Sequence, residues 1–301
     1  MIEDRIIKII KDKGPLTGSQ ILDHINEDPL LLLRSCRLSK DLAVRIVGTR
    51  YLRLDRKIDG FARLSPSILR EFLTYSVIGL EADRARMESK AEALRCHIEK
   101  ISRYKSELAY NLVSVLAGRI GDDLPVKDHV CFILAGDIVF NMAHDVPRPE
   151  RSTRKKVQGS DMDIVAIVGR DFPETLVRRL DDEIYREKAR LLLNPYMREE
   201  IDYIVKDLDR VIEQMRFDTF KHMVACKIMH EGAFLYGSED IFHLIKNMLR
   251  ENGVIEKIRS MEERAGVFRE QAEEYLLKGD FARIKEMTDF FYPAEESEEF
   301  E

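Results

Sequence analysis

The chain has 301 residues, of which 45% are hydrophobic and 35% are charged, and its formal net charge is −6. This composition is typical of a packed, water-soluble protein of two or three domains, and the net charge excludes a protein that coats nucleic acid indiscriminately. The longest apolar runs, such as residues 29–33 and 164–168, are far too short to cross a bilayer, so we expect no membrane contact.

The four cysteines are scattered and form no CxxC pair, which argues against a zinc knuckle or a redox pair. Cys131 and Cys226 have apolar neighbours, as is typical of buried thiols in a reducing compartment. The first residues contain no basic segment followed by an apolar one, so they predict no signal peptide. Together these features indicate a cytoplasmic protein.

Residues 1–78 combine three predicted short helices with a small β-ribbon. An amphipathic stretch opens the chain, and Thr17 and Asp28-Pro29 mark the starts of two further helices. Alternating apolar residues then cover 42–55, and Asp59-Gly60 predicts a hairpin turn. Three short helices followed by a β-ribbon are typical of a winged helix-turn-helix domain.

This first region carries 14 basic and 10 acidic residues, and several of the bases lie on the predicted ribbon. Basic wings contact phosphates and groove edges in DNA-binding winged helices. The ribbon therefore predicts a surface for duplex DNA, with the alternative that the domain serves only dimerisation or docking. The predicted DNA-binding residues are Arg50, Arg53, Arg56, Lys57 and Arg63.

Residues 79–127 form a predicted helical linker. From residue 68 to 117 apolar side chains recur at helical spacing, with Gly79 as the only glycine and no proline. This pattern predicts one or two long helices, which either pair in a homodimer or pack within one chain. Residues 246–301 again predict helices, including one over 281–291, followed by an acidic tail that we expect to be disordered.

Residues 128–245 have a mixed pattern, with strands expected over 130–135, 161–168 and 201–205, which places the whole chain in the α+β class. Alternate side chains of a strand project to the same side, so Asp161 and Asp163 would lie together. A divalent cation removes the repulsion between them. Asp202 interrupts a later apolar strand and is the best third acid. The three predict a site for Mg²⁺, with Mn²⁺ as its substitute, suited to phosphoryl chemistry.

The segments Leu134-Ala135-Gly136, Gly159-Ser160-Asp161-Met162-Asp163 and Ile201-Asp202-Tyr203 together resemble the DNA polymerase β-like nucleotidyltransferase superfamily. Its members have a strand ending in Gly-Ser or Gly-Gly, an Asp-x-Asp strand and a later strand with a single Asp. The resemblance covers roughly residues 128–240. It implies that Asp161, Asp163 and Asp202 are catalytic and hold the metal. It implies an NTP substrate, for which the candidate binding residues are Gly136, Gly159, Ser160, Lys221 and Tyr236.

Two features depart from the family pattern. Asp137 follows Gly136, where the family usually has a Ser or Gly that helps to hold the triphosphate. The gap between Gly136 and Asp161 is also longer than usual, and it includes a basic segment over 147–156. This segment either closes over a triphosphate or a polynucleotide, or forms a solvated loop.

Three of the nucleotide-binding residues also have simpler interpretations. Ser160 either donates to a phosphate or only begins a strand. Tyr236 either stacks on a base or packs a helix against the sheet. Lys221 either reaches a phosphate as a point charge or faces solvent.

Two functions follow from these patterns. The first is an enzyme that transfers a nucleoside monophosphate from an NTP to an unidentified acceptor by positioning and charge neutralisation. The second is a DNA-binding transcriptional regulator whose nucleotidyltransferase-like domain senses nucleotide without turnover. Asp137 favours the regulator, whereas three crowded strand carboxylates, which are costly without a metal, favour the enzyme. A partner-binding scaffold would bind neither nucleotide nor metal.

Overall fold

The computed structural model describes residues 1–301 apart from 121–125, 151–152, 281–283, 285–289 and 294–301. Helices and sheets are mixed, in agreement with the predicted α+β class. The acidic tail and most of the predicted helix over 281–291 lie outside the described residues. Within the described residues no helix is long and apolar enough to cross a membrane.

The chain divides into two compact units whose boundaries differ from the four predicted regions. Unit 1 contains residues 1–98 together with 261–301, and unit 2 contains residues 99–260. The predicted C-terminal region is therefore split between the units, and so is the predicted linker.

The helices of unit 1 start where the sequence predicts them. Thr17 accepts a hydrogen bond from the backbone N–H of Gln20, and Asp28 accepts from those of Leu30 and Leu31. The short helices and turns of this unit are α1 (Ile2–Lys13), α2 (Gly18–Ile25), α3 (Pro29–Leu38), η1 (Asp59–Phe61), α4 (Ile68–Thr74) and η2 (Glu81–Asp83).

Unit 1 contains a three-stranded antiparallel sheet and a separate hairpin. The sheet has the order β1-β5-β2, with β1 (Leu16–Thr17), β5 (Ser76–Leu80) and β2 (Leu42–Ile46). The hairpin pairs β3 (Tyr51–Leu54) with β4 (Ala62–Ser65), which confirms the predicted turn at Asp59-Gly60. The ribbon differs from the prediction because β2 pairs with β5 and not with β3.

The strand β5 lies within the stretch where the sequence predicted one or two long helices, so that prediction was wrong for residues 76–80. Val77 and Ile78 are fully buried, and β5 pairs with β1 along one edge and with β2 along the other. A central strand reads as a short continuous apolar run, which periodicity alone does not distinguish from buried helix. The predicted long helix follows as α5 (Arg84–Ile120).

Unit 2 is built on a four-stranded mixed sheet with the order β10-β9-β6-β11. The strands β9 and β10 are parallel, and β6 is antiparallel to both β9 and β11. Three of these strands confirm the predicted ones. Their bounds are Val130–Ala135 for β6, Met162–Val168 for β9, Ile201–Asp207 for β10 and Ala233–Gly237 for β11.

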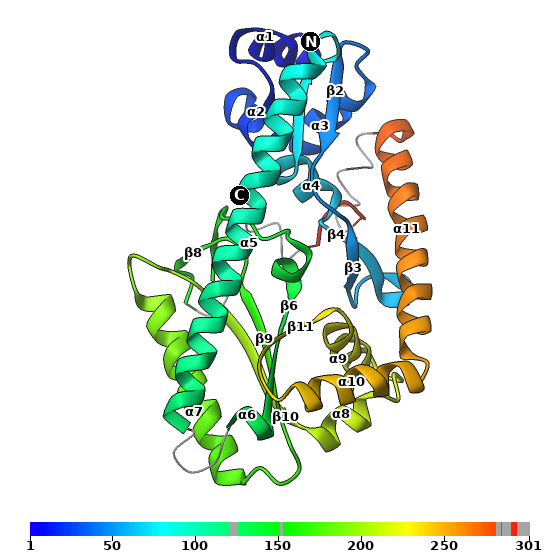
Figure 1. Cartoon of the computed structure of the whole chain (residues 1–301). Helices are drawn as coiled ribbons and strands as arrows, with labels where there is room; N and C mark the ends of the chain where they lie inside the picture. Colours follow the sequence, from blue (N-terminus) through cyan, green and yellow to red (C-terminus); the bar gives the residue numbers. More distant parts are fainter. Residues whose placement is uncertain (121–125, 151–152, 281–283, 285–289, 294–301) are drawn as a thin grey trace. The chain divides into compact units, whose positions relative to one another are not determined.

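Helices cover both faces of this sheet (Figure 1). The later part of α5 and α7 (Glu174–Leu193) bury the face that carries Phe132, Leu134 and Ile164. The other face is covered by α8 (Leu208–Gln214), α9 (Phe220–Glu231) and α10 (Glu239–Glu251). The remaining elements are α6 (Val126–His129), η3 (Gly136–Phe140), β7 (Pro147–Pro149), β8 (Lys156–Gln158) and α11 (Val254–Lys278), the last of which continues from unit 2 into unit 1.

Lys206 on β10 is a buried cation whose charge should make stability depend on pH. Its Nζ donates to Gln214 Oε1 at 2.9 Å, and burial lowers the pKa of Lys206 to about 8. An unfolded lysine keeps its proton up to about pH 10.4. Between these values the unfolded state binds more protons, so this group's contribution to stability grows as pH rises above 8 and is lost as pH falls through 8.

We expect Lys206→Met to remove this dependence. Between pH 7.5 and 9.5, the free energy of unfolding should rise by about 1–2 kcal/mol less in the variant than in the wild type. Urea denaturation at the two pH values measures the difference. Equal pH dependence in both proteins would contradict the burial of a charged Lys206.

Candidate metal site

The three predicted acids meet at one end of the unit 2 sheet. Asp163 on β9 is the register partner of Asp202 on β10 and, on its other side, of Ala135 on β6. Asp161 immediately precedes β9. One carboxylate oxygen from each of the three acids lies within 4.8 Å of those of the other two. The structure therefore brings together all three residues that the sequence selected.

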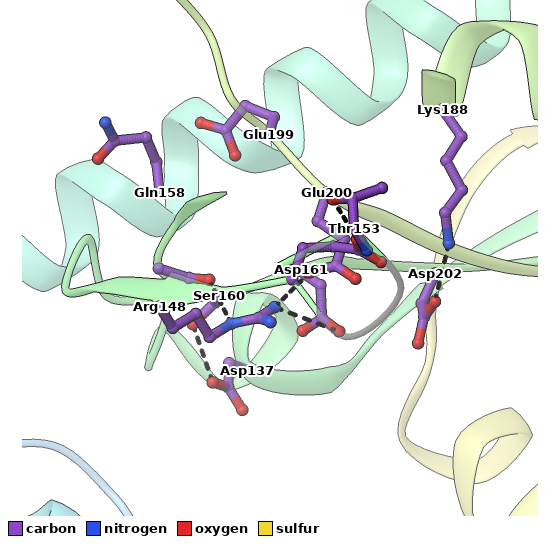
Figure 2. Close-up of polar contacts among 12 residues, drawn as sticks. Asp137, Arg148, Thr153, Gln158, Ser160, Asp161, Lys188, Glu199, Glu200 and Asp202 are labelled. Carbon is purple, nitrogen blue, oxygen red and sulfur yellow. Dashed lines mark hydrogen bonds and ion pairs between the residues drawn. The ribbon is translucent and has the colours of Figure 1, made fainter. Parts of the chain in front are cut away.

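The hairpin β7–β8 adds an arginine that sequence reasoning did not select individually. Arg148 donates from Nε to the carbonyl oxygen of Gly159 at 2.9 Å, and its Nη2 lies 2.9 Å from Glu200 and 3.7 Å from Asp161 (Figure 2). Burial raises the pKa of Glu200; Arg148 opposes this rise, and Asp161 and Asp202 add to it. The basic segment over 147–156 was the sequence signal for this contact, and Glu200 had none.

A second cation reaches the site from α7. Lys188 Nζ lies 3.2 Å from Asp202 Oδ1 (Figure 2). The helix α7 covers the opposite face of the sheet, so the lysine side chain passes the edge strand β10 to reach this carboxylate. No sequence pattern pointed to Lys188, because helix periodicity does not indicate which residues reach around a sheet edge.

Gly136 fits its position for a steric reason. It begins η3 with a φ of +73°, and a Cβ there would lie 2.1 Å from Asp163 Oδ2. Its backbone N–H favours the charged form of the buried Glu231 carboxylate, which also pairs with Lys227 at 2.5 Å. Burial raises the pKa of Glu231; Lys227 opposes this rise, and the nearby Asp137 adds to it.

We expect Gly136→Ala to destabilise the protein by about 2–4 kcal/mol, because the variant combines a left-handed backbone with a clash against Asp163. Urea denaturation measures the loss. Gly118→Ala is the matched control, since a Cβ at this exposed position in α5 meets no atom within 4 Å. The control should be stabilised by about 0.5–1 kcal/mol. A Gly136→Ala variant as stable as the wild type would contradict this packing.

Gly159 and Ser160 also lie at the site and shape the turn into β9. Ser160 donates its hydroxyl proton to Asp137 Oδ2 at 2.9 Å and accepts from the backbone N–H of His144 at 3.2 Å. Gly159 has a φ of +66°, and a Cβ there would lie 1.8 Å from the carbonyl oxygen of His144. The hydroxyl proton of Ser160 is therefore already engaged in a hydrogen bond to Asp137.

The two remaining predicted nucleotide-binding residues are not brought to the acids. Tyr236 pairs in register with Phe132 and packs against the core on the α5 side, where its ring contacts Tyr110 at 5.9 Å. Lys221 is exposed in the first turn of α9, whereas Glu231 near Gly136 is in the last turn. Lys221 and Glu231 are ten positions apart in this helix, about 15 Å along its axis.

The predicted DNA-binding residues lie on or beside the β3–β4 hairpin of unit 1. Arg56 and Lys57 are exposed in its loop, and Arg53 is the register partner of Arg63. Arg63 is only 6% exposed and pairs with Asp55 at 3.2 Å. Arg56 and Lys57 are thus the most accessible residues of the predicted set.

Arg50 belongs to an ion-pair cluster within unit 1. It donates twice to Glu71, at 2.6 and 2.8 Å, and its Nη2 also lies 2.8 Å from Glu273. Arg269 contacts the same two acids at 2.9 and 2.7 Å. Arg50 therefore links segments of unit 1, a role that the sequence did not indicate.

The three acids fit a hard divalent cation. All the donors are carboxylate oxygens, which both Mg²⁺ and Mn²⁺ prefer, and they converge from adjacent positions on strands. Arg148 and Lys188 each approach one of the three acids, so they offset only part of the repulsion among them. A divalent cation would offset the rest.

No protein-family model matches the chain, and no curated protein matches it. The chemistry of the site therefore carries the functional inference.

Proposed function

We propose that the chain is a metal-dependent nucleotidyltransferase, which moves a nucleoside monophosphate from an NTP to an acceptor and releases pyrophosphate. The observation that carries the proposal is the register of Asp163 with Asp202, with Asp161 beside them and Gly136 against the Asp163 carboxylate. A mixed sheet with an Asp-x-Asp segment at the start of a central strand supports the resemblance to the DNA polymerase β-like superfamily.

In this proposal Asp161 and Asp163 would hold the metal, and Asp202 would complete the site. The bound ion would supply neutralisation of the charge on the phosphates. Asp202 lies on the edge strand and is exposed, so an acceptor hydroxyl can approach it. Its carboxylate would orient that hydroxyl and help to remove its proton.

Product analysis tests this proposal. The full chain is incubated with Mg²⁺ and each of the four α-labelled NTPs, with an EDTA control, and pyrophosphate and labelled products are measured. We expect pyrophosphate release with at least one NTP, abolished by EDTA. No turnover with any NTP, together with tight and salt-dependent binding to duplex DNA, would overturn the enzyme proposal.

The nucleotide-sensing regulator is the second candidate, and two observations favour it. Asp137 places a carboxylate at the turn after β6 and engages the Ser160 hydroxyl that would otherwise face phosphate. In unit 1, the helices α1–α3 and the sheet β1-β5-β2 resemble a winged helix whose wing is enlarged by residues 47–75. A regulator of this kind would bind NTP and DNA without releasing pyrophosphate.

A further inference from the structure

The two cations beside the acidic site are held in different ways. Arg148 is 11% exposed and is fixed by Glu200 and the Gly159 carbonyl group, so it belongs to the wall of the site. Lys188 is 24% exposed, and within the described part of the chain Asp202 is its sole hydrogen-bond and ion-pair partner. Among the described residues, Lys188 can therefore leave its carboxylate without breaking another hydrogen bond or ion pair.

The pair of Lys188 and Asp202 is also well suited to exchange. Asp202 is 52% exposed, and near-surface ion pairs form and break at small cost. A lysine is a compact charge on a flexible stem, unlike the rigid fork of an arginine. Its ammonium group, 3.2 Å from Asp202 Oδ1, stands where a divalent cation bound to Asp202 would be repelled.

We propose that Lys188 competes with the divalent cation for Asp202 and so lowers the metal affinity of the site. The inference rests on the proposed function, because it takes Asp202 as a metal ligand. Lys188 acts as a positioning residue: its ammonium group neutralises Asp202 in the absence of metal and swings away from this carboxylate when the metal binds.

Metal titration tests the competition directly. Free Mn²⁺ is measured by electron paramagnetic resonance as the full chain is titrated, without nucleotide. We expect Lys188→Met to bind Mn²⁺ roughly threefold to tenfold more tightly than the wild type. Arg186→Met is the matched control: it removes the same charge from the same helix, where Arg186 is 70% exposed and pairs with Glu183. The Mn²⁺ affinity of Arg186→Met should stay within about twofold of that of the wild type.

A second variant pair shows whether the effect passes through Asp202. In an Asp202→Asn background, Lys188→Met should leave Mn²⁺ affinity unchanged. An equal increase in both backgrounds would mean a general charge effect and would overturn the inference. Equal affinities of the wild type and Lys188→Met would overturn it while leaving the metal site intact. No Mn²⁺ binding by either protein would remove the metal site and the inference together.

Discussion

Replacing Asp163 by Asn is expected to reduce pyrophosphate release roughly a thousandfold or more, because several kcal/mol of metal-supplied charge stabilisation would be lost. Asp163 is the central acid, paired in register with Asp202 and in contact with the Gly136 turn. Asparagine keeps the shape of the side chain and removes its charge. Initial rates at saturating Mg²⁺ and NTP measure the effect.

Asp209→Asn is the matched control for this change. Asp209 is an exposed acid on α8 that pairs with Arg170 at 2.9 Å, away from the three acids. The rate of pyrophosphate release by Asp209→Asn should stay within about twofold of that of the wild type. In EDTA, Asp163→Asn should be at least as stable as the wild type, because one of three crowded charges is gone. A variant that is stable and fully active would mean that Asp163 is not catalytic.

Replacing Lys105 by Met is expected to destabilise the protein by about 3–5 kcal/mol, as is typical when one partner of a buried ion pair is removed. Lys105 on α5 is 1% exposed, lies 2.5 Å from Glu199 and donates to the carbonyl oxygen of Gln158 at 2.8 Å. Burial raises the pKa of Glu199, and Lys105 opposes this rise. Without Lys105 the carboxylate would lose its counter-charge, and urea denaturation measures the loss.

Two further variants separate the buried ion pair from a general effect of charge. The double variant Lys105→Met with Glu199→Met should recover much of the lost stability, because both buried charges are then gone. Arg178→Met breaks a pair on α7 in which Arg178 and Glu174 are 77% and 80% exposed, and it should change stability little. If Lys105→Met also changes stability little, the pair does not contribute as the structure indicates.

The Lys105 contacts also explain how the site is positioned. Gln158 directly precedes Gly159 and the turn into β9, and Glu199 precedes Glu200 and the start of β10. Lys105 on α5 therefore contacts both segments that lead to the acids and holds them in place. The loss of Lys105 should consequently weaken Mn²⁺ binding as well as folding.

The strands that carry the acids were predictable because each is an apolar run interrupted by carboxylates. Asp161, Asp163 and Asp202 stood out for the same reason. The groups around them were not predictable in this way. Lys188 comes from a helix on the other face of the sheet, and Glu231 comes from the last turn of α9. Their places depend on tertiary packing, which periodicity does not record.

The contacts made by the charged residues of the predicted ribbon were likewise not predictable from the sequence. The sequence reveals where Arg50 lies but not its partners, Glu71 and Glu273, which are 21 and 223 residues away. It likewise does not reveal that Arg63 is buried beside Asp55. The strand β5 escaped prediction because a buried central strand and a buried helix share one apolar pattern.

We propose that Asp161, Asp163 and Asp202 together bind a divalent cation. Anomalous diffraction from crystals of the full chain soaked in Mn²⁺ tests it most directly. We expect a manganese peak within bonding distance of carboxylate oxygens of these residues, and no such peak in Asp163→Asn crystals. Wild-type crystals that bind Mn²⁺ elsewhere and leave these three carboxylates without a peak would contradict it.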